Sequence, residues 1–159
     1  MSVLLEYAAK SGQHEILLEL LEDLYPNLFD DPPYDLQKDW DAAFYVGLAL
    51  IQSGDIDRGG HLLRDVLKLA DPYEEALGPA WESVAARLAL GEREAAISTF
   101  REFARVNKWT RLGIMSQTIL RHSSIFNPIR NEPEFIELLE FYRTNAAEQR
   151  RLVQEMGIH

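Results

Sequence analysis

Residues 40–73 read WDAAFYVGLALIQSGDIDRGGHLLRDVLKLADPY, and this stretch decides the fold. Small and apolar residues recur every three or four positions on both sides of Gly54-Asp55, which is the spacing of one face of an α-helix. They are Ala43, Val46, Gly47 and Leu50 before the turn, and Gly59, Leu63 and Val66 after it. A glycine can end the first helix at positive φ, and an aspartate can cap the second. The stretch therefore predicts a helical hairpin in which Gly47 and Gly59 let two antiparallel helices approach closely.

The rest of the chain repeats this pattern, so we expect an all-α fold. Residues 2–25 form a shorter hairpin around Ser11-Gly12, the central unit covers residues 39–70, and a third hairpin covers residues 75–107. Two further helices are expected at residues 110–121 and 133–156. The residues expected to face the core are Leu4, Leu5, Ala8, Leu17, Leu21 and Leu24 in the first hairpin, and Trp81, Val84, Ala85, Leu88, Ala96, Phe100 and Phe103 in the third.

A proline-rich insertion separates the first two hairpins. Residues 26–38 contain three prolines and several acids, and proline disfavours helix both at its own position and before it. The segment also contains three apolar residues, Leu28, Phe29 and Tyr34, which are not typical of a free linker. We therefore expect them to fold back on the first two hairpins. A calcium site is the alternative for the acids. The sequence argues against it, since the alternating oxygen ligands and central glycine of an EF-hand loop are missing.

Composition and charge restrict the function further. The chain has 159 residues, 47% of them apolar, which is enough for one domain, residues 1–159, with a continuous core. It has no cysteine, no apolar run near the roughly 20 residues of a bilayer span, and no secretory signal. We therefore expect a cytoplasmic protein without membrane contact.

The negative charge lies almost entirely in the first half. Residues 1–80 carry 16 acids against 5 Lys or Arg, whereas residues 81–159 carry 10 acids against 11. An acidic surface of this kind repels phosphate backbones, so we do not expect nucleic acid as a ligand. We expect a basic partner instead. Ordinary solvated surface that keeps the protein soluble is the alternative interpretation.

The central hairpin resembles a tetratricopeptide repeat, whose signature residues correspond to Val46, Gly47, Leu50, Gly59 and Leu63. Ala43 stands where the repeat usually has its first Trp, and the closing proline comes slightly late, at Pro72. For one unit alone an ordinary helical hairpin is the alternative. With three such units, the resemblance implies a right-handed α-solenoid of three tetratricopeptide-like hairpins followed by two C-terminal helices.

The closing segment is similar to the end of tetratricopeptide tracts in bacterial multidomain regulators, where such tracts join adenylate cyclase, winged-helix or kinase domains. The matching residues are Phe126, Pro128, Ile129, Arg130, Glu132, Pro133 and Phe135, with Ile129 and Glu132 departing from the usual Leu and Asp. The expected first helix lacks about one turn of a complete repeat, which suggests that the array starts before Met1; a naturally short first helix is the alternative. We therefore predict a partner-binding or sensory tract of a bacterial regulator. A free-standing acidic adaptor, such as a secretion chaperone, is the alternative.

Catalytic and cofactor motifs are missing from the sequence. His14, His61, His122 and His159 are scattered, and there is no HExxH, GxxxxGK[ST], GxGxxG or GxSxG pattern. A turn with capping serines explains His122-Ser123-Ser124 better than a catalytic triad does. We therefore expect no enzyme activity, no cofactor and no metal site.

The tetratricopeptide resemblance implies a concave groove lined by the first helix of each hairpin. The expected groove residues are Glu6, Asp41, Phe44, Tyr45, Leu48, Glu82, Ala86 and Arg111. Three acids in a row repel a carboxylate, so the groove should prefer a basic or neutral peptide with an apolar anchor at Phe44 and Tyr45. Two alternatives stay open: Phe44 and Tyr45 pack under residues 26–38, or the terminal helix is the binding surface. The second of these would suit self-association as a homodimer.

Overall fold

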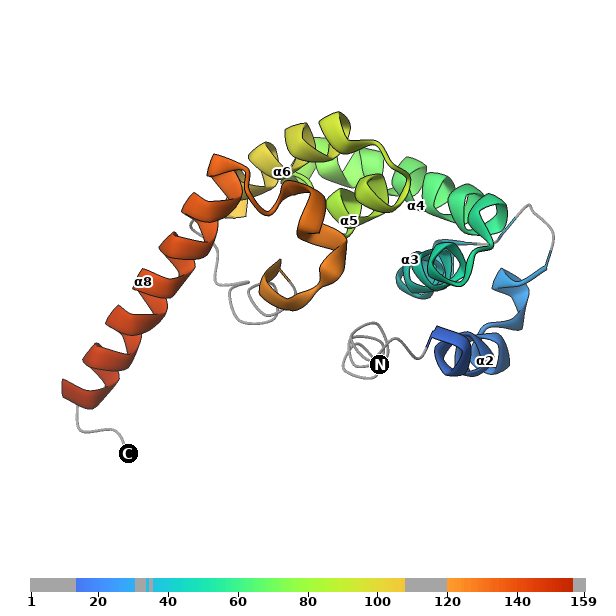
Figure 1. Cartoon of the computed structure of the whole chain (residues 1–159), viewed down its shortest axis with the longest axis horizontal. Helices are drawn as coiled ribbons and strands as arrows, with labels where there is room; N and C mark the ends of the chain where they lie inside the picture. The colour runs from blue at the N-terminus through green and yellow to red at the C-terminus, as the bar shows by residue number, and fades with distance from the viewer. Residues whose placement is uncertain (1–13, 31–33, 35, 108–119, 156–159) are drawn as a thin grey trace.

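The structure is a computed structural model that describes residues 14–30, 34, 36–107 and 120–155. Every regular element in these ranges is helical, which confirms the all-α class (Figure 1). The elements are α2 (His14–Leu24), the 3-10 helix η1 (Pro26–Leu28), α3 (Leu36–Ser53), α4 (Ile56–Leu77), α5 (Trp81–Ala89), α6 (Arg93–Asn107), the 3-10 helix η2 (Ser124–Ile129) and α8 (Pro133–Glu155). None of these described helices combines the length and apolar composition that a bilayer span requires.

The central hairpin has the close helix contact that its glycines predict. Helices α3 and α4 make the most extensive contact among the described elements. A Cβ placed on Gly59 would lie 2.7 Å from the carbonyl oxygen of Gly47 and 2.9 Å from the amide nitrogen of Ile51. The turn is as expected, with Gly54 at a φ of 101° and the Asp55 side chain accepting a hydrogen bond from the backbone N–H of Arg58 at 3.3 Å. Backbone meets backbone at this crossing because neither glycine carries a side chain.

The end of this hairpin differs from the prediction. Helix α4 does not stop at residue 70, before Pro72, but continues to Leu77 with Pro72 inside it. It ends at Gly78, whose φ is 83° and whose backbone N–H donates to the carbonyl oxygen of Glu74 at 2.8 Å. The third hairpin accordingly starts at Trp81 rather than at residue 75. Residues 75–77 are the last turn of the second hairpin.

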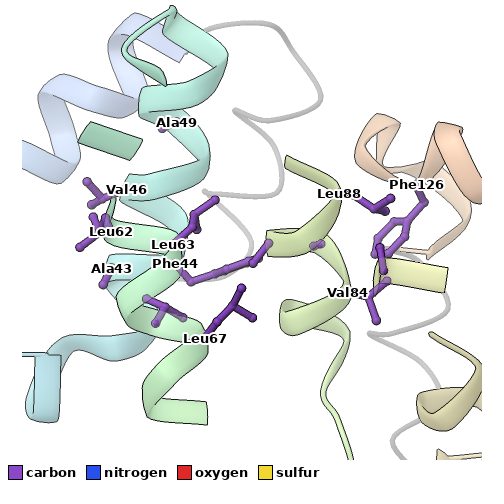
Figure 2. Close-up of a cluster of buried hydrophobic side chains, with 14 of the residues drawn as sticks. Ala43, Phe44, Val46, Ala49, Leu62, Leu63, Leu67, Val84, Leu88 and Phe126 are labelled. Atoms are coloured by element: carbon purple, nitrogen blue, oxygen red, sulfur yellow. The ribbon is translucent and has the colours of Figure 1, made fainter. Parts of the chain in front are cut away.

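One continuous core joins the hairpins. Figure 2 shows apolar side chains filling the space between α3 and α4, with Phe44 reaching from α3 toward α5, and Val84, Leu88 and Phe126 gathered on the far side of α5. The core residues expected for the third hairpin are confirmed: Val84, Ala85, Leu88, Ala96, Phe100 and Phe103 are buried, and Trp81 is partly buried against them.

The insertion before α3 behaves as predicted, whereas α2 does so only in part. Leu28 is buried, and Phe29 and Tyr34 are partly buried against the core. In α2, Leu17 and Leu21 are buried, but Leu24 is 51% exposed, so its expected core position was wrong. The partners expected for this helix at Leu4, Leu5 and Ala8 lie outside the described residues.

The C-terminal segment docks on the third hairpin through aromatic packing. Phe126 of η2 and Phe135 of α8 are fully buried, and the ring of Phe135 stacks on that of Phe100 in α6 with centroids 5.1 Å apart. Two ion pairs join the same elements: Arg93 with Glu132 at 2.6 Å and Arg101 with Glu134 at 2.8 Å. From this contact α8 extends away from the other helices (Figure 1).

Arg130 organises the turn between His122 and α8. Its guanidinium donates to the carbonyl oxygens of Leu120 at 3.3 Å, Arg121 at 2.8 Å and Ser123 at 2.8 Å. It also donates to the side-chain oxygen of Asn127 at 3.1 Å. Only a planar fork with several N–H donors can bind so many carbonyl groups at once. The segment that resembles the tail of regulatory repeat tracts is thus held by its own arginine.

Candidate functional site

The candidate site lies where α3 and α5 begin, and it contains the acids Asp41 and Glu82. Helix α3 is interrupted at Asp39, whose φ of −121° and ψ of 23° are not helical, so its regular part begins at Trp40. Asp41 therefore lies in the first turn of that regular part, and Glu82 lies in the first turn of α5. Among the described side chains, neither acid forms an ion pair.

The pKa of Glu82 responds to its surroundings, including the charge of Asp41. The pKa of Glu82 is raised from 4.5 to about 7, chiefly because burial removes water from its carboxylate. A hydrogen bond from its own backbone opposes this change, and the negative charge of Asp41 adds to it. Two of the three acids predicted to converge are thus close enough to interact. The third, Glu6, lies outside the described residues.

Phe44 was predicted to line the groove, but its side chain is completely buried. Its ring packs edge-on against Trp81 of α5, with centroids 5.5 Å apart, and against Tyr45 at 5.1 Å. Phe44 therefore fastens α3 to α5 and offers no surface to a peptide. A core aromatic and a groove aromatic have the same helical spacing, so sequence alone could not separate the two interpretations.

The other predicted groove residues divide between core and surface. Ala86 is fully buried, so it too was wrongly placed in the groove. Tyr45 and Leu48 are partly buried at the edge of the core and keep some exposed surface. Asp41 is exposed and Glu82 is partly buried. Arg111 lies outside the described residues.

The described residues contain no group of three or more His, Asp or Glu side chains placed to hold a metal ion. What the site offers instead is a negative charge beside a packed aromatic cluster, on two successive hairpins.

Comparisons of the whole chain with protein-family models, with curated protein sequences and with solved structures find no match.

Sequence reasoning missed one exposed feature, the end of α4. The sequence prediction ends the second hairpin at residue 70, before Pro72, and starts the third at residue 75. A signal was nevertheless present: Leu69, Tyr73 and Leu77 continue at four-residue spacing across Pro72. Tyr73 and Leu77 are among the most exposed large apolar residues in the described ranges.

Proposed function

We propose that this chain is a tetratricopeptide-like helical-repeat module that binds a basic segment of another protein along the first helices of its hairpins. The observation that carries the proposal is the position of Asp41 and Glu82 at the starts of the first helices of two successive hairpins, where the charge of Asp41 contributes to the raised pKa of Glu82. The close Gly47–Gly59 crossing supports the repeat assignment, because this family places small residues where the helices of one unit cross. A right-handed superhelical array of such units would present both acids in one groove.

The charge around the pair favours a cationic ligand. Burial and mutual repulsion make two neighbouring carboxylates costly, and a Lys or Arg side chain placed between them removes part of that cost. Because Phe44 is buried, only the exposed parts of Tyr45 and Leu48 are left to contact an apolar side chain of the peptide. Binding should therefore depend more on charge than on apolar burial.

A binding titration tests this with matched charge changes. A labelled Lys/Ser peptide is titrated by fluorescence anisotropy against the wild type, against Asp41→Asn/Glu82→Gln, and against the control Asp57→Asn/Glu94→Gln. The control removes two exposed acids from the first turns of the second helices α4 and α6, so the net charge is the same. We expect the first double variant to weaken binding by about three- to tenfold, the range for two exposed charge contacts, and the control to have little effect.

Salt and pH provide two further readouts of the same titration. The affinity should fall as salt screens the charges over roughly 8 Å at physiological ionic strength. It should rise as the pH is raised through about 7, because Glu82 gains its negative charge there. Equal weakening by both double variants would mean that the peptide senses only net charge, and the groove proposal would then be wrong.

The C-terminal segment is the basis for a proposal about the biological setting. We propose a partner-binding or sensory tract of a cytoplasmic bacterial regulator, supported by the segment around Phe126, Arg130 and Phe135 that closes the third hairpin. The acidity of residues 1–80 favours the second candidate, a free-standing adaptor or secretion chaperone. Reading the gene upstream of Met1 distinguishes them, since a continuous reading frame into an effector domain supports only the first.

A further inference from the structure

The last two turns of α4 are largely exposed. Of residues 71–77 only Glu74 is partly buried, and the others are exposed. Two large apolar side chains lie here, Tyr73 with 70% and Leu77 with 76% of its surface exposed. Pro72 and Ala76 are exposed beside them. Single exposed apolar residues are ordinary, but four on adjacent turns of one helix make a continuous surface.

Helix geometry joins these four residues into one ridge. Tyr73 and Leu77 are four residues apart, as are Pro72 and Ala76, so the two pairs run side by side along the helix. One turn earlier, Leu69 is partly buried against the core and connects the ridge to the folded interior. We call Pro72, Tyr73, Ala76 and Leu77 the α4 ridge.

The ridge is held in place at its far end. Gly78 closes α4 with a φ of 83°, and a Cβ at this position would lie 2.9 Å from Val106 of α6. The end of α4 therefore sits against the end of the next hairpin. A surface fixed in this way loses little conformational freedom when a partner binds, which favours affinity.

The surroundings of the ridge are mainly acidic, although Lys68 lies one turn before Pro72 and pairs with Asp65 at 2.8 Å. From Leu69 to Ala86 the chain carries four acids, Asp71, Glu74, Glu75 and Glu82, and no Lys or Arg. Asp71 and Glu75 are exposed beside the ridge. Such a rim repels phosphate groups of nucleic acids and anionic lipids and attracts cationic side chains.

We propose that the α4 ridge is a docking surface for a basic amphipathic helix of another protein. Apolar side chains of that helix would cover Tyr73 and Leu77, and its Lys or Arg side chains would reach Asp71 and Glu75. Tyrosine is enriched among the residues that dominate binding energy at protein interfaces, and helix-on-helix docking uses anchors one turn apart. This goes beyond the groove proposal, because the ridge belongs to the second helix of a hairpin and not to the first helices.

A titration with an amphipathic Lys/Leu peptide tests the ridge. The variant is Tyr73→Ser/Leu77→Ser, and the control Ile56→Ser/Ile136→Ser removes two other exposed apolar residues, at the start of α4 and on α8. All four positions are exposed, so both variants should fold, which urea unfolding verifies. We expect the ridge variant to bind about tenfold or more weakly, as for loss of interface anchors, and the control to bind as the wild type does.

Several outcomes would overturn the ridge proposal. Equal weakening by both variants would show that the peptide adheres to apolar surface in general, and equally tight binding of a Glu/Leu peptide would remove the role of the acidic rim. Sedimentation that finds a wild-type dimer and a monomeric ridge variant would assign the surface to a second copy of this chain. Ridge-dependent binding to neutral lipid vesicles, without peptide binding, would assign it to a membrane.

Discussion

The carboxyl group of Glu82 should make the stability of this protein depend on pH. Its pKa is raised from 4.5 to about 7 in the folded state, mainly by burial. The folded protein therefore holds this proton more tightly than the unfolded chain does. It follows that the free energy of unfolding is highest below a pH of about 4.5, falls between about 4.5 and 7, and is flat above, as far as this group is concerned.

The size of this effect follows from the same values. One pKa unit corresponds to about 1.4 kcal/mol, so an ionised Glu82 lowers the stability by at most about 3 kcal/mol. Glu82→Gln keeps the shape of the side chain and removes its charge. We expect this variant to be more stable than the wild type by about 1 to 3 kcal/mol near pH 8, and to differ by under about 0.5 kcal/mol near pH 4.5.

Urea unfolding followed by circular dichroism at the two pH values measures the difference. The control is Glu94→Gln, since Glu94 lies in the first turn of α6 as Glu82 does in α5, but is exposed. Its effect should stay within about 0.5 kcal/mol at both pH values. If Glu82→Gln shifts stability equally at both pH values, or destabilises near pH 8, then Glu82 is not desolvated and the Asp41–Glu82 pair is not formed as described.

Two further predictions concern the packing. Gly59→Ala should destabilise by about 1 to 3 kcal/mol, because its Cβ would meet the backbone of Gly47, whereas Gly60→Ala should be neutral or stabilise by up to about 1 kcal/mol, since its Cβ would make only ordinary contacts from 3.5 Å outward. Thermal unfolding of both variants measures this, and equal shifts would contradict the close crossing. Arg130→Lys should cost about 1 to 3 kcal/mol, because an ammonium group with three donors cannot form all four hydrogen bonds of the guanidinium. A silent Arg130→Lys would show that these hydrogen bonds do not hold the turn.

Local signals predicted most of the described helices and their contact faces. The Gly54-Asp55 turn and the small residues at the α3–α4 crossing depend on residues close in sequence. Such features need no knowledge of the rest of the fold, because backbone conformation and helical spacing determine them. They were accordingly the reliable part of the prediction.

The end of α4 was predicted wrongly, because proline is usually a stop signal and outweighed the apolar spacing that continues across it. A proline inside a helix removes one hydrogen bond and costs about 3 kcal/mol, which normally ends the helix. The carbonyl group that Pro72 leaves without a donor is that of Lys68, and Lys68 is exposed, so water can bond it. The end of α4 at Gly78 packs against Val106, and this contact stabilises the longer helix. The local sequence does not reveal such a contact, because Val106 is distant along the chain.

The groove position of Asp41 and Glu82 stays a prediction, whereas that of Phe44 was wrong. Periodicity tells which residues share a face, but in a helical array a helix is buried on two sides, by its own hairpin and by the next. Phe44 and Ala86 were assigned to the open side, and both are buried in the core. Only the placement of α5 beside α3, with Trp81 against Phe44, decides between those sides.

The position of the acids has a physical reason of its own. Asp41 and Glu82 both lie in the first turn of a helix, at the starts of α3 and α5. The first turn of a helix carries a partial positive charge, which stabilises a carboxylate there by about 0.3 to 1 kcal/mol and offsets part of the repulsion between two of them. In Glu82 burial outweighs this help, as its raised pKa shows. The two acids thus lie at helix starts, where the helix dipole reduces the free-energy cost of their charges. Among the described side chains neither forms an ion pair, so a cationic ligand could pair with them.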